Sequence, residues 1–194
     1  LLNMLSHSKD TKFYKTQLSS FEYPRNKHYP MTEAWALGSA ELQNAQIETN
    51  THSWHGYIKN GWFTLKREDL DKEQQILELD GITQLDFTFD QAMRPVVVWV
   101  KNDKSFIYRY VDTSYSTIEL SDKFKCPRVE LDDKLKENAS TSDVILVYTY
   151  GGKLCYALQR DRFLQEFVIG NDPTKSLVWR VGTTKDGRFG IQWR

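Results

Sequence analysis

The densest cluster of ionisable side chains lies in the segment Gln159-Arg160-Asp161-Arg162-Phe163, inside an otherwise apolar stretch. Two arginines around an aspartate can act as a clamp, because a guanidinium donates paired hydrogen bonds to a carboxylate or a phosphate. The same alternation also suits a structural role, in which the charges pair across neighbouring strands and protect a sheet edge from aggregation. We predict Arg160 and Arg162 as partner-binding residues, and we add Arg180 and Arg188 because residues 151–194 carry an excess of basic side chains.

Histidine and cysteine residues offer few metal ligands. His52 and His55 have a His-x-x-His spacing, but residues three apart on a strand point to opposite faces, so shared ligation would need a bulge or a turn. Cys126 and Cys155 have no histidine near them in the sequence, and two small buried thiols are the simpler interpretation. We expect no metal site and no cofactor.

Glycoside hydrolysis requires two positioned carboxylates. The sequence offers Asp86 with Asp90, or Asp132 with Asp133, and an aspartate at the end of a strand commonly caps or turns the backbone instead. Glycine-rich phosphate loops, nucleophile elbows and helical metalloprotease motifs do not occur in the sequence. We therefore expect no catalytic residues and no enzymatic activity.

The elements that must position these side chains are β-hairpins. Asn60-Gly61, Gly151-Gly152 and Asp186-Gly187 each separate two runs rich in β-branched and aromatic residues, and Asn102-Asp103-Lys104 is a looser version of the same pattern. A two-residue type I′ turn requires positive φ at both central positions, which glycine, asparagine and aspartate tolerate. The sequence therefore predicts a hairpin at each of these places.

The strands that flank the hairpins repeat with a period of about 40 to 50 residues, which is typical of blade architectures. Each unit is expected to hold four antiparallel strands, and the first unit is expected to open at residues 45–47. The last hairpin is half a unit, which a strand near residues 13–17 or another chain would complete. The predicted fold class is all-β, made of repeated antiparallel four-stranded hairpin units in a small β-propeller-like, meander or sandwich domain.

Hydrophobic patterning predicts which strand faces are covered. Residues 96–100 and 144–148 are apolar on both faces, which is typical of strands that lie between neighbouring sheets. In residues 106–110 three aromatic side chains alternate with Ile107 and Arg109, and we expect the aromatic face to be buried and the other to lie nearer water.

The N-terminal part of the chain differs from the rest. Residues 1–31, with Pro24, Pro30 and many charged side chains, are expected to form an extended arm, and residues 32–194 the β-rich domain. Helix signals are weak, since residues 32–44 have moderate helix composition but carry Gly38 in the middle.

Composition excludes several classes of protein. The 194 residues hold 26 Lys plus Arg and 26 Asp plus Glu, and a net charge of zero removes the usual argument for a nucleic-acid partner. The longest apolar run, at residues 95–100, is far shorter than the roughly 18 residues that a membrane span needs. We predict neither nucleic-acid binding nor membrane insertion.

A family resemblance is carried by five segments in a fixed order. They are LDFTFDQAMRPVVVW at residues 85–99, CPRVELDDK at 126–134, SDVILVY at 142–148, LCY at 154–156 and QRDRF at 159–163. Together they resemble a family of virion structural proteins from tailed bacteriophages, over about residues 82–194. Members of that family usually read Tyr-Arg-Gln-Gln-Arg-Asp-Arg, and this chain has Ala157 and Leu158 in place of the Arg-Gln step.

The resemblance implies a tail component, such as part of the tail tip or hub, a nozzle or a fibre-attachment part, that acts by protein–protein assembly. Its partners would be other phage tail proteins and further copies of itself in a homo-oligomer. It would be located in the virion tail, after assembly in the host cytoplasm. The alternative is a carbohydrate-binding β-propeller module that recognises a host surface glycan, which an exposed aromatic side chain beside Asp or Asn in a hollow would favour.

Overall fold

The computed structural model describes residues 32–38, 42, 52–131, 143–183 and 189–193. The predicted arm at residues 1–31, which includes the strand near 13–17, and the predicted opening strand at 45–47 lie outside the described residues. The described chain consists of antiparallel strands and a short 3₁₀ helix, so the all-β prediction is confirmed. No helix in this part of the chain is long and apolar enough to cross a membrane.

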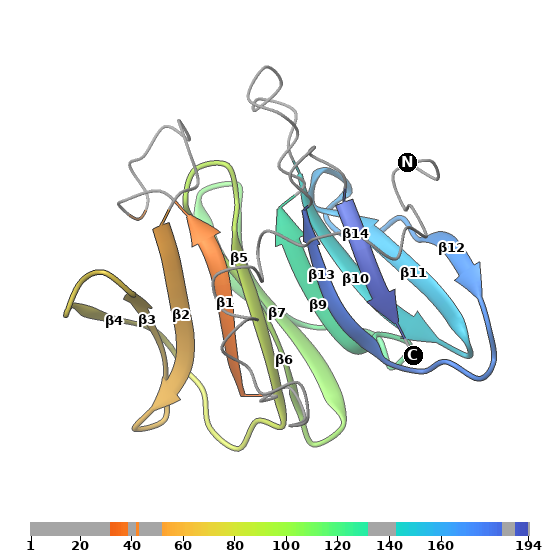
Figure 1. Cartoon of the computed structure of the whole chain (residues 1–194), viewed down its shortest axis with the longest axis horizontal. Helices are drawn as coiled ribbons and strands as arrows, with labels where there is room; N and C mark the ends of the chain where they lie inside the picture. The colour runs from red at the N-terminus through yellow and green to blue at the C-terminus, as the bar shows by residue number, and fades with distance from the viewer. Residues whose placement is uncertain (1–31, 39–41, 43–51, 132–142, 184–188, 194) are drawn as a thin grey trace.

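The strands form three four-stranded sheets and one two-stranded sheet, each following the order of the chain (Figure 1). The first sheet contains β1 (Glu33–Gly38), β2 (His52–Lys59), β3 (Trp62–Arg67) and β4 (Glu73–Glu78). The second contains β5 (Gln84–Phe89), β6 (Pro95–Lys101), β7 (Lys104–Val111) and β8 (Ser114–Glu119). The third contains β9 (Lys125–Leu131), β10 (Val144–Tyr150), β11 (Lys153–Leu158) and β12 (Phe167–Asn171), with the 3₁₀ helix η3 (Gln159–Asp161) between the last two. The last contains β13 (Val178–Thr183) and β14 (Phe189–Trp193).

Tight turns form where the sequence predicts them. Their central residues have positive φ angles: 51° and 80° at Asn60 and Gly61, 51° and 60° at Asn102 and Asp103, and 54° and 77° at Gly151 and Gly152. Asp186-Gly187 lies outside the described residues, but β13 and β14 on either side of it pair as an antiparallel hairpin. The repeated four-stranded hairpin units of the prediction are therefore confirmed.

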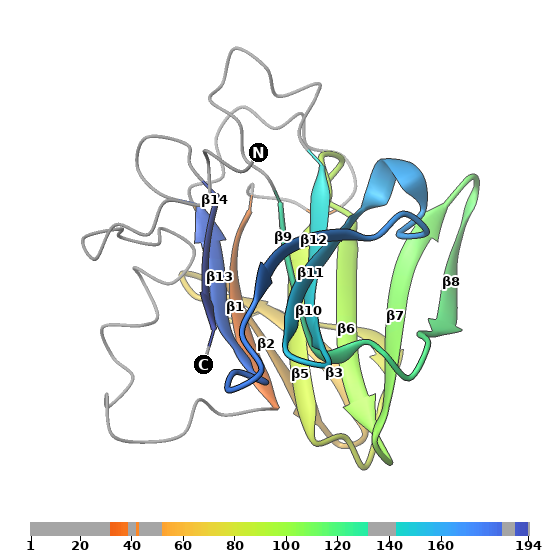
Figure 2. The same ribbon diagram turned by 90° about the vertical axis from the view of Figure 1, so that its right-hand side faces the viewer.

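The sheets stack face to face in the order of the chain (Figures 1 and 2). The first strands lie next to one another, with β1 against β5, β5 against β9, and β9 against β13. A separate apolar core fills the space between each pair of neighbouring sheets. The described chain is thus an arc of blade-like sheets whose first strands line one side.

Strand β6 shows why two of the strands are apolar throughout. Val96 and Val98 lie in the core between the second and third sheets, while Val97 and Trp99 lie in the core against the first sheet. The side chains of β10 alternate in the same way between the core against the second sheet and the core against the fourth sheet. The prediction that these strands are covered on both faces is confirmed.

Two local predictions were wrong. The first sheet opens with β1, at residues 33–38, and not with a strand at residues 45–47, because Ala34 and Ala36 of β1 pack in the first core. In β7 the aromatic side chains Phe106 and Tyr108 are only partly buried against the first core, and the more deeply buried face is that of Ile107 and Arg109, exposed by 0% and 8%. The third sheet covers this face of β7 as well, so the strand has no side that is simply solvent-facing.

Candidate functional site

The segment with the two predicted arginines forms a tight turn at the end of β11. Asp143, just before β10, holds this turn: its Oδ1 accepts a hydrogen bond from the Arg160 backbone N–H at 3.1 Å, and its Oδ2 accepts one from Arg160 Nε at 2.5 Å. Asp143 is buried, so this ion pair is partly shielded from water. Arg160 therefore has a partner within the chain, across 17 residues of sequence.

The backbone of the same turn adopts an unusual conformation. Arg162 and Phe163 have φ angles of 54° and 60°, in the left-handed region that non-glycine residues avoid at a cost of about 1–2 kcal/mol each. Backbone hydrogen bonds fix the turn, from Arg162 N to Gln159 O at 2.8 Å and from Phe163 N to Leu158 O at 2.9 Å. As a result Phe163 is buried in the core between the second and third sheets, while the following Leu164 is 83% exposed.

The other face of the turn contacts the second sheet. The guanidinium of Arg109, in β7, lies 5.8 Å from the centre of the Phe163 ring, and Arg162 Nη2 lies 3.4 Å from Asp112 Oδ1 in the β7–β8 turn. Arg162 and Asp112 are 61% and 70% exposed, so their pairing is weak. Burial, and next the positive charge of Arg162, lower the pKa of Arg109. The turn thus brings the exposed Arg162 near the buried Arg109.

Of the two remaining predicted arginines, only Arg180 lies within the described residues, in β13 of the fourth sheet. The backbone of Arg180 pairs with Gln192 in the β13–β14 hairpin, and its side chain is not described. Arg188 lies outside the described residues. The structure therefore brings Arg162 together with Arg109, which the sequence did not suggest, and leaves the prediction for Arg180 and Arg188 as it stood.

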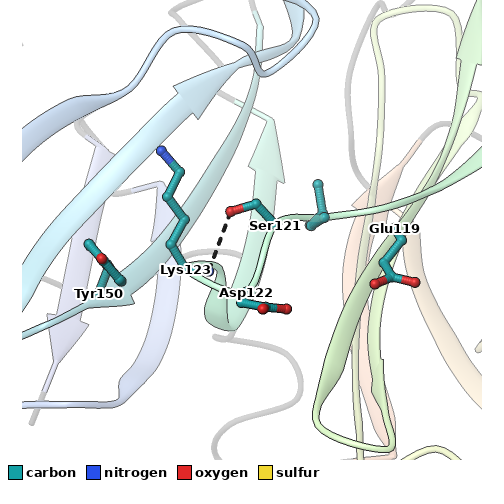
Figure 3. A pocket seen from close by; sticks show the side chains of 6 residues that line it. Glu119, Ser121, Asp122, Lys123 and Tyr150 are labelled. Atoms are coloured by element: carbon teal, nitrogen blue, oxygen red, sulfur yellow. Dashed lines mark hydrogen bonds between the residues drawn. The ribbon is translucent and has the colours of Figure 1, made fainter.

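An open hollow of about 690 Å³ lies between the second and third sheets, along the link from β8 to β9. Figure 3 shows Tyr150 and Lys123 on one side of it and Glu119 on the other, with Ser121 and Asp122 between them. Tyr150 is 49% exposed. An exposed aromatic ring beside hydroxyl and carboxylate groups is a combination that suits a sugar.

A partly buried polar network lies beside this hollow. Glu166 Oε2 accepts a hydrogen bond from the Tyr148 hydroxyl at 2.5 Å and forms an ion pair with Lys123 Nζ at 3.0 Å. These two donors lower the pKa of Glu166, and burial raises the pKa of Tyr148. Lys123 is therefore held by Glu166 as well as lining the hollow.

The two histidines with the His-x-x-His spacing have different partners. His52 Nδ1 lies 3.4 Å from Asp69 Oδ2, whereas His55 Nε2 lies 3.1 Å from Glu33 Oε2 and stacks on Trp35. Cys155 is buried in β11, and burial raises the pKa of its thiol to about 11. The described residues contain no group of three His, Cys, Asp or Glu side chains placed to hold a metal ion.

Asp86 and Asp90, the first of the two carboxylate pairs that the sequence offers, bind backbone N–H groups. Asp90 closes the β5–β6 loop by accepting hydrogen bonds from the backbone N–H groups of Ala92 and Arg94 at 2.9 and 3.0 Å and from Arg94 Nε at 2.7 Å. Asp86 Oδ2 accepts the Val129 N–H at 3.0 Å. Asp132 and Asp133 lie outside the described residues.

Asp86 belongs to a polar seam between neighbouring sheets that sequence reasoning missed. Gln84 Nε2 donates to Pro127 O at 3.0 Å, and Thr88 Oγ1 accepts the Leu131 N–H at 3.3 Å. On β9, Arg128 continues the pattern by donating to Val178 O in β13 at 3.4 Å. The signal was the alternation of polar and apolar residues in β5, whose side chains are all buried. The seam joins the first strands of successive sheets by hydrogen bonds.

Comparisons with known proteins add no relative: no family model, no curated protein and no solved structure matches this chain.

Proposed function

We propose that the protein is a structural component of a bacteriophage tail that acts by binding neighbouring proteins, including further copies of itself. The observation that carries the proposal is the turn at Arg162 and Phe163. Left-handed conformations at two successive non-glycine residues are costly, and such strain persists where the surrounding structure enforces it, often at functional sites. Here the strained turn directs Arg162 and Leu164 outward while Phe163 anchors it in the core.

Two further observations support this role. The QRDRF segment that forms the turn is also one of the segments that resemble phage virion proteins. In addition, the arc of sheets has outer strands whose edges can pair with strands of other subunits. A tail part of this kind would be assembled in the host cytoplasm and remain in the virion.

The experiment compares two exposed leucines in the phage that encodes the protein. Leu164→Asp places a charge on the strained turn, and Leu70→Asp places one on the first sheet, where the leucine is 44% exposed. We expect Leu164→Asp to lower incorporation of the protein into purified particles and Leu70→Asp to leave it unchanged. Equal incorporation of both variants at the wild-type level would count against the turn as an assembly surface.

The hollow at Tyr150 favours a second candidate function, the binding of a host surface glycan. Its exposed ring and the neighbouring Asp122 are the features that a sugar site requires. A glycan array probed with the wild-type protein and with Tyr150→Ala tests it. Binding that the substitution abolishes would support this function, and a wild-type protein that retains no glycan would exclude it.

A further inference from the structure

Arg109 is buried in a position where a charge needs a partner. It lies on the face of β7 that packs on the third sheet, after Ser105, which donates to Phe124 O at 2.6 Å, and the fully buried Ile107. Arg109 itself is only 8% exposed. A guanidinium has five donors and no acceptor, and a buried one is normally paired with a carboxylate.

No carboxylate pairs with Arg109 in the described part of the chain. Its Nη1 is buried and has no hydrogen-bond partner. The Phe163 ring, at 5.8 Å, lies near the outer limit of about 6 Å for a cation–π contact. The neighbouring charge is that of Arg162, which has the same sign. The buried Arg109 guanidinium therefore has an unpaired donor next to a second positive charge, an arrangement that favours the binding of an anion.

We propose that Arg109 and Arg162 together bind a carboxylate presented by an acidic segment of a partner protein. The inference deepens the assembly function proposed above and rests on it for the identity of the partner. Arg162 is 61% exposed and only weakly paired, so its side chain can turn outward and open the way to Arg109. The carboxylate would then accept hydrogen bonds from both guanidinium groups.

The surroundings favour a peptide over a phosphate or a nucleic acid. Leu164, 83% exposed, offers an apolar contact beside the two arginines. Asp112, at the rim of the site, would repel a doubly charged phosphate more than a single carboxylate. The chain as a whole has no net charge to attract a polyanion.

The test measures binding of a fluorescent peptide of six glutamates, blocked at both ends, to the full chain at low ionic strength. Arg162→Gln removes the exposed cation and Arg109→Met the buried one, and we expect each to weaken binding about ten-fold or more. Lys104→Gln is the matched control, because it removes an exposed cation from the same strand as Arg109. It should leave the affinity unchanged.

Thermal unfolding of the variants checks that they are folded. Arg109→Met replaces a buried cation by an apolar side chain of similar length, so its Tm should equal or exceed that of the wild type. If this variant does not fold, the comparison of Arg162→Gln with Lys104→Gln decides alone. An equal loss in both, or no binding by the wild type, would overturn the site.

Competition separates the possible anions. Blocked glutamate should displace the labelled peptide at lower concentration than inorganic phosphate or a single-stranded oligonucleotide, and the reverse order would overturn the carboxylate assignment. These measurements use the isolated chain. A failure here therefore leaves the protein's place in the phage tail untouched, and its absence from phage particles would leave the measured site in place.

Discussion

Asp86 provides the sharpest test of how successive sheets are joined. Its side chain is 2% exposed and lies between β5 and β9, where Oδ2 accepts the Val129 N–H at 3.0 Å. In Asp86→Ala that N–H remains buried and loses this acceptor. In Asp86→Asn an amide oxygen can still accept it, although without the negative charge.

The expected magnitudes follow from the burial of this bond. A hydrogen bond to a charged group contributes about 1.5–3 kcal/mol, and loss of a buried charge offsets part of the cost, so we expect Asp86→Ala to lower the free energy of unfolding by about 2 kcal/mol. For a chain of this length that corresponds to a fall in Tm of about 4–8 °C. Asp86→Asn should cost about half as much.

Circular dichroism during heating measures these changes, with Asp80→Ala as the control. Asp80 is 79% exposed and pairs with Lys101 at the surface, so its removal should leave Tm unchanged within error. If Asp86→Ala melted at the same temperature as Asp80→Ala, the polar seam would not hold the sheets together and the reasoning would be refuted.

Three other predictions follow from the cores and the polar network. Gly56→Ala would place a Cβ 2.6 Å from Phe87 Cε1, so we expect the free energy of unfolding measured in urea to fall by about 1–3 kcal/mol. An unchanged urea midpoint would show that the first sheet packs more loosely than this distance implies. In a Cys126→Ser background, Cys155 should react with a thiol reagent at pH 8 only after unfolding, because burial raises the pKa of its thiol to about 11. Rapid labelling of Cys155 in the folded protein would contradict its burial. The lowered pKa of Glu166 means that its stabilising effect is present above pH 4.5 and is lost as the pH falls below that value. Glu166→Gln should therefore show a smaller fall in Tm on acidification than the wild type. Identical dependence of Tm on pH in the two proteins would disprove the coupling.

Local chemistry explains which parts of the fold could be predicted. Asn60-Gly61 and Gly151-Gly152 form tight turns because their conformational preferences act within the turn itself. Strand β6 could be placed between two sheets because residues 96–100 are all apolar, so neither face of the strand is polar. Strand β1 could not, since its small side chains favour neither structure strongly and the first core decides the outcome.

The candidate site depends on contacts that are distant in sequence. The partner of Arg160 is Asp143, which lies 17 residues earlier in the chain, on the other side of the open end of the β10–β11 hairpin. Arg109 was assigned to the face nearer water because three aromatic side chains occupy the other face of β7. That inference assumes a sheet with one solvated side, and it fails where a second sheet covers the strand.

The proposal that most needs a direct test is that the protein is a structural part of a phage tail. Electron microscopy of gradient-purified particles from the phage that encodes it, labelled with gold-conjugated antibody against this chain, tests the claim most directly. The account predicts gold particles on the tail of intact virions. Label confined to lysate fractions without particles, with none on intact virions, would contradict it.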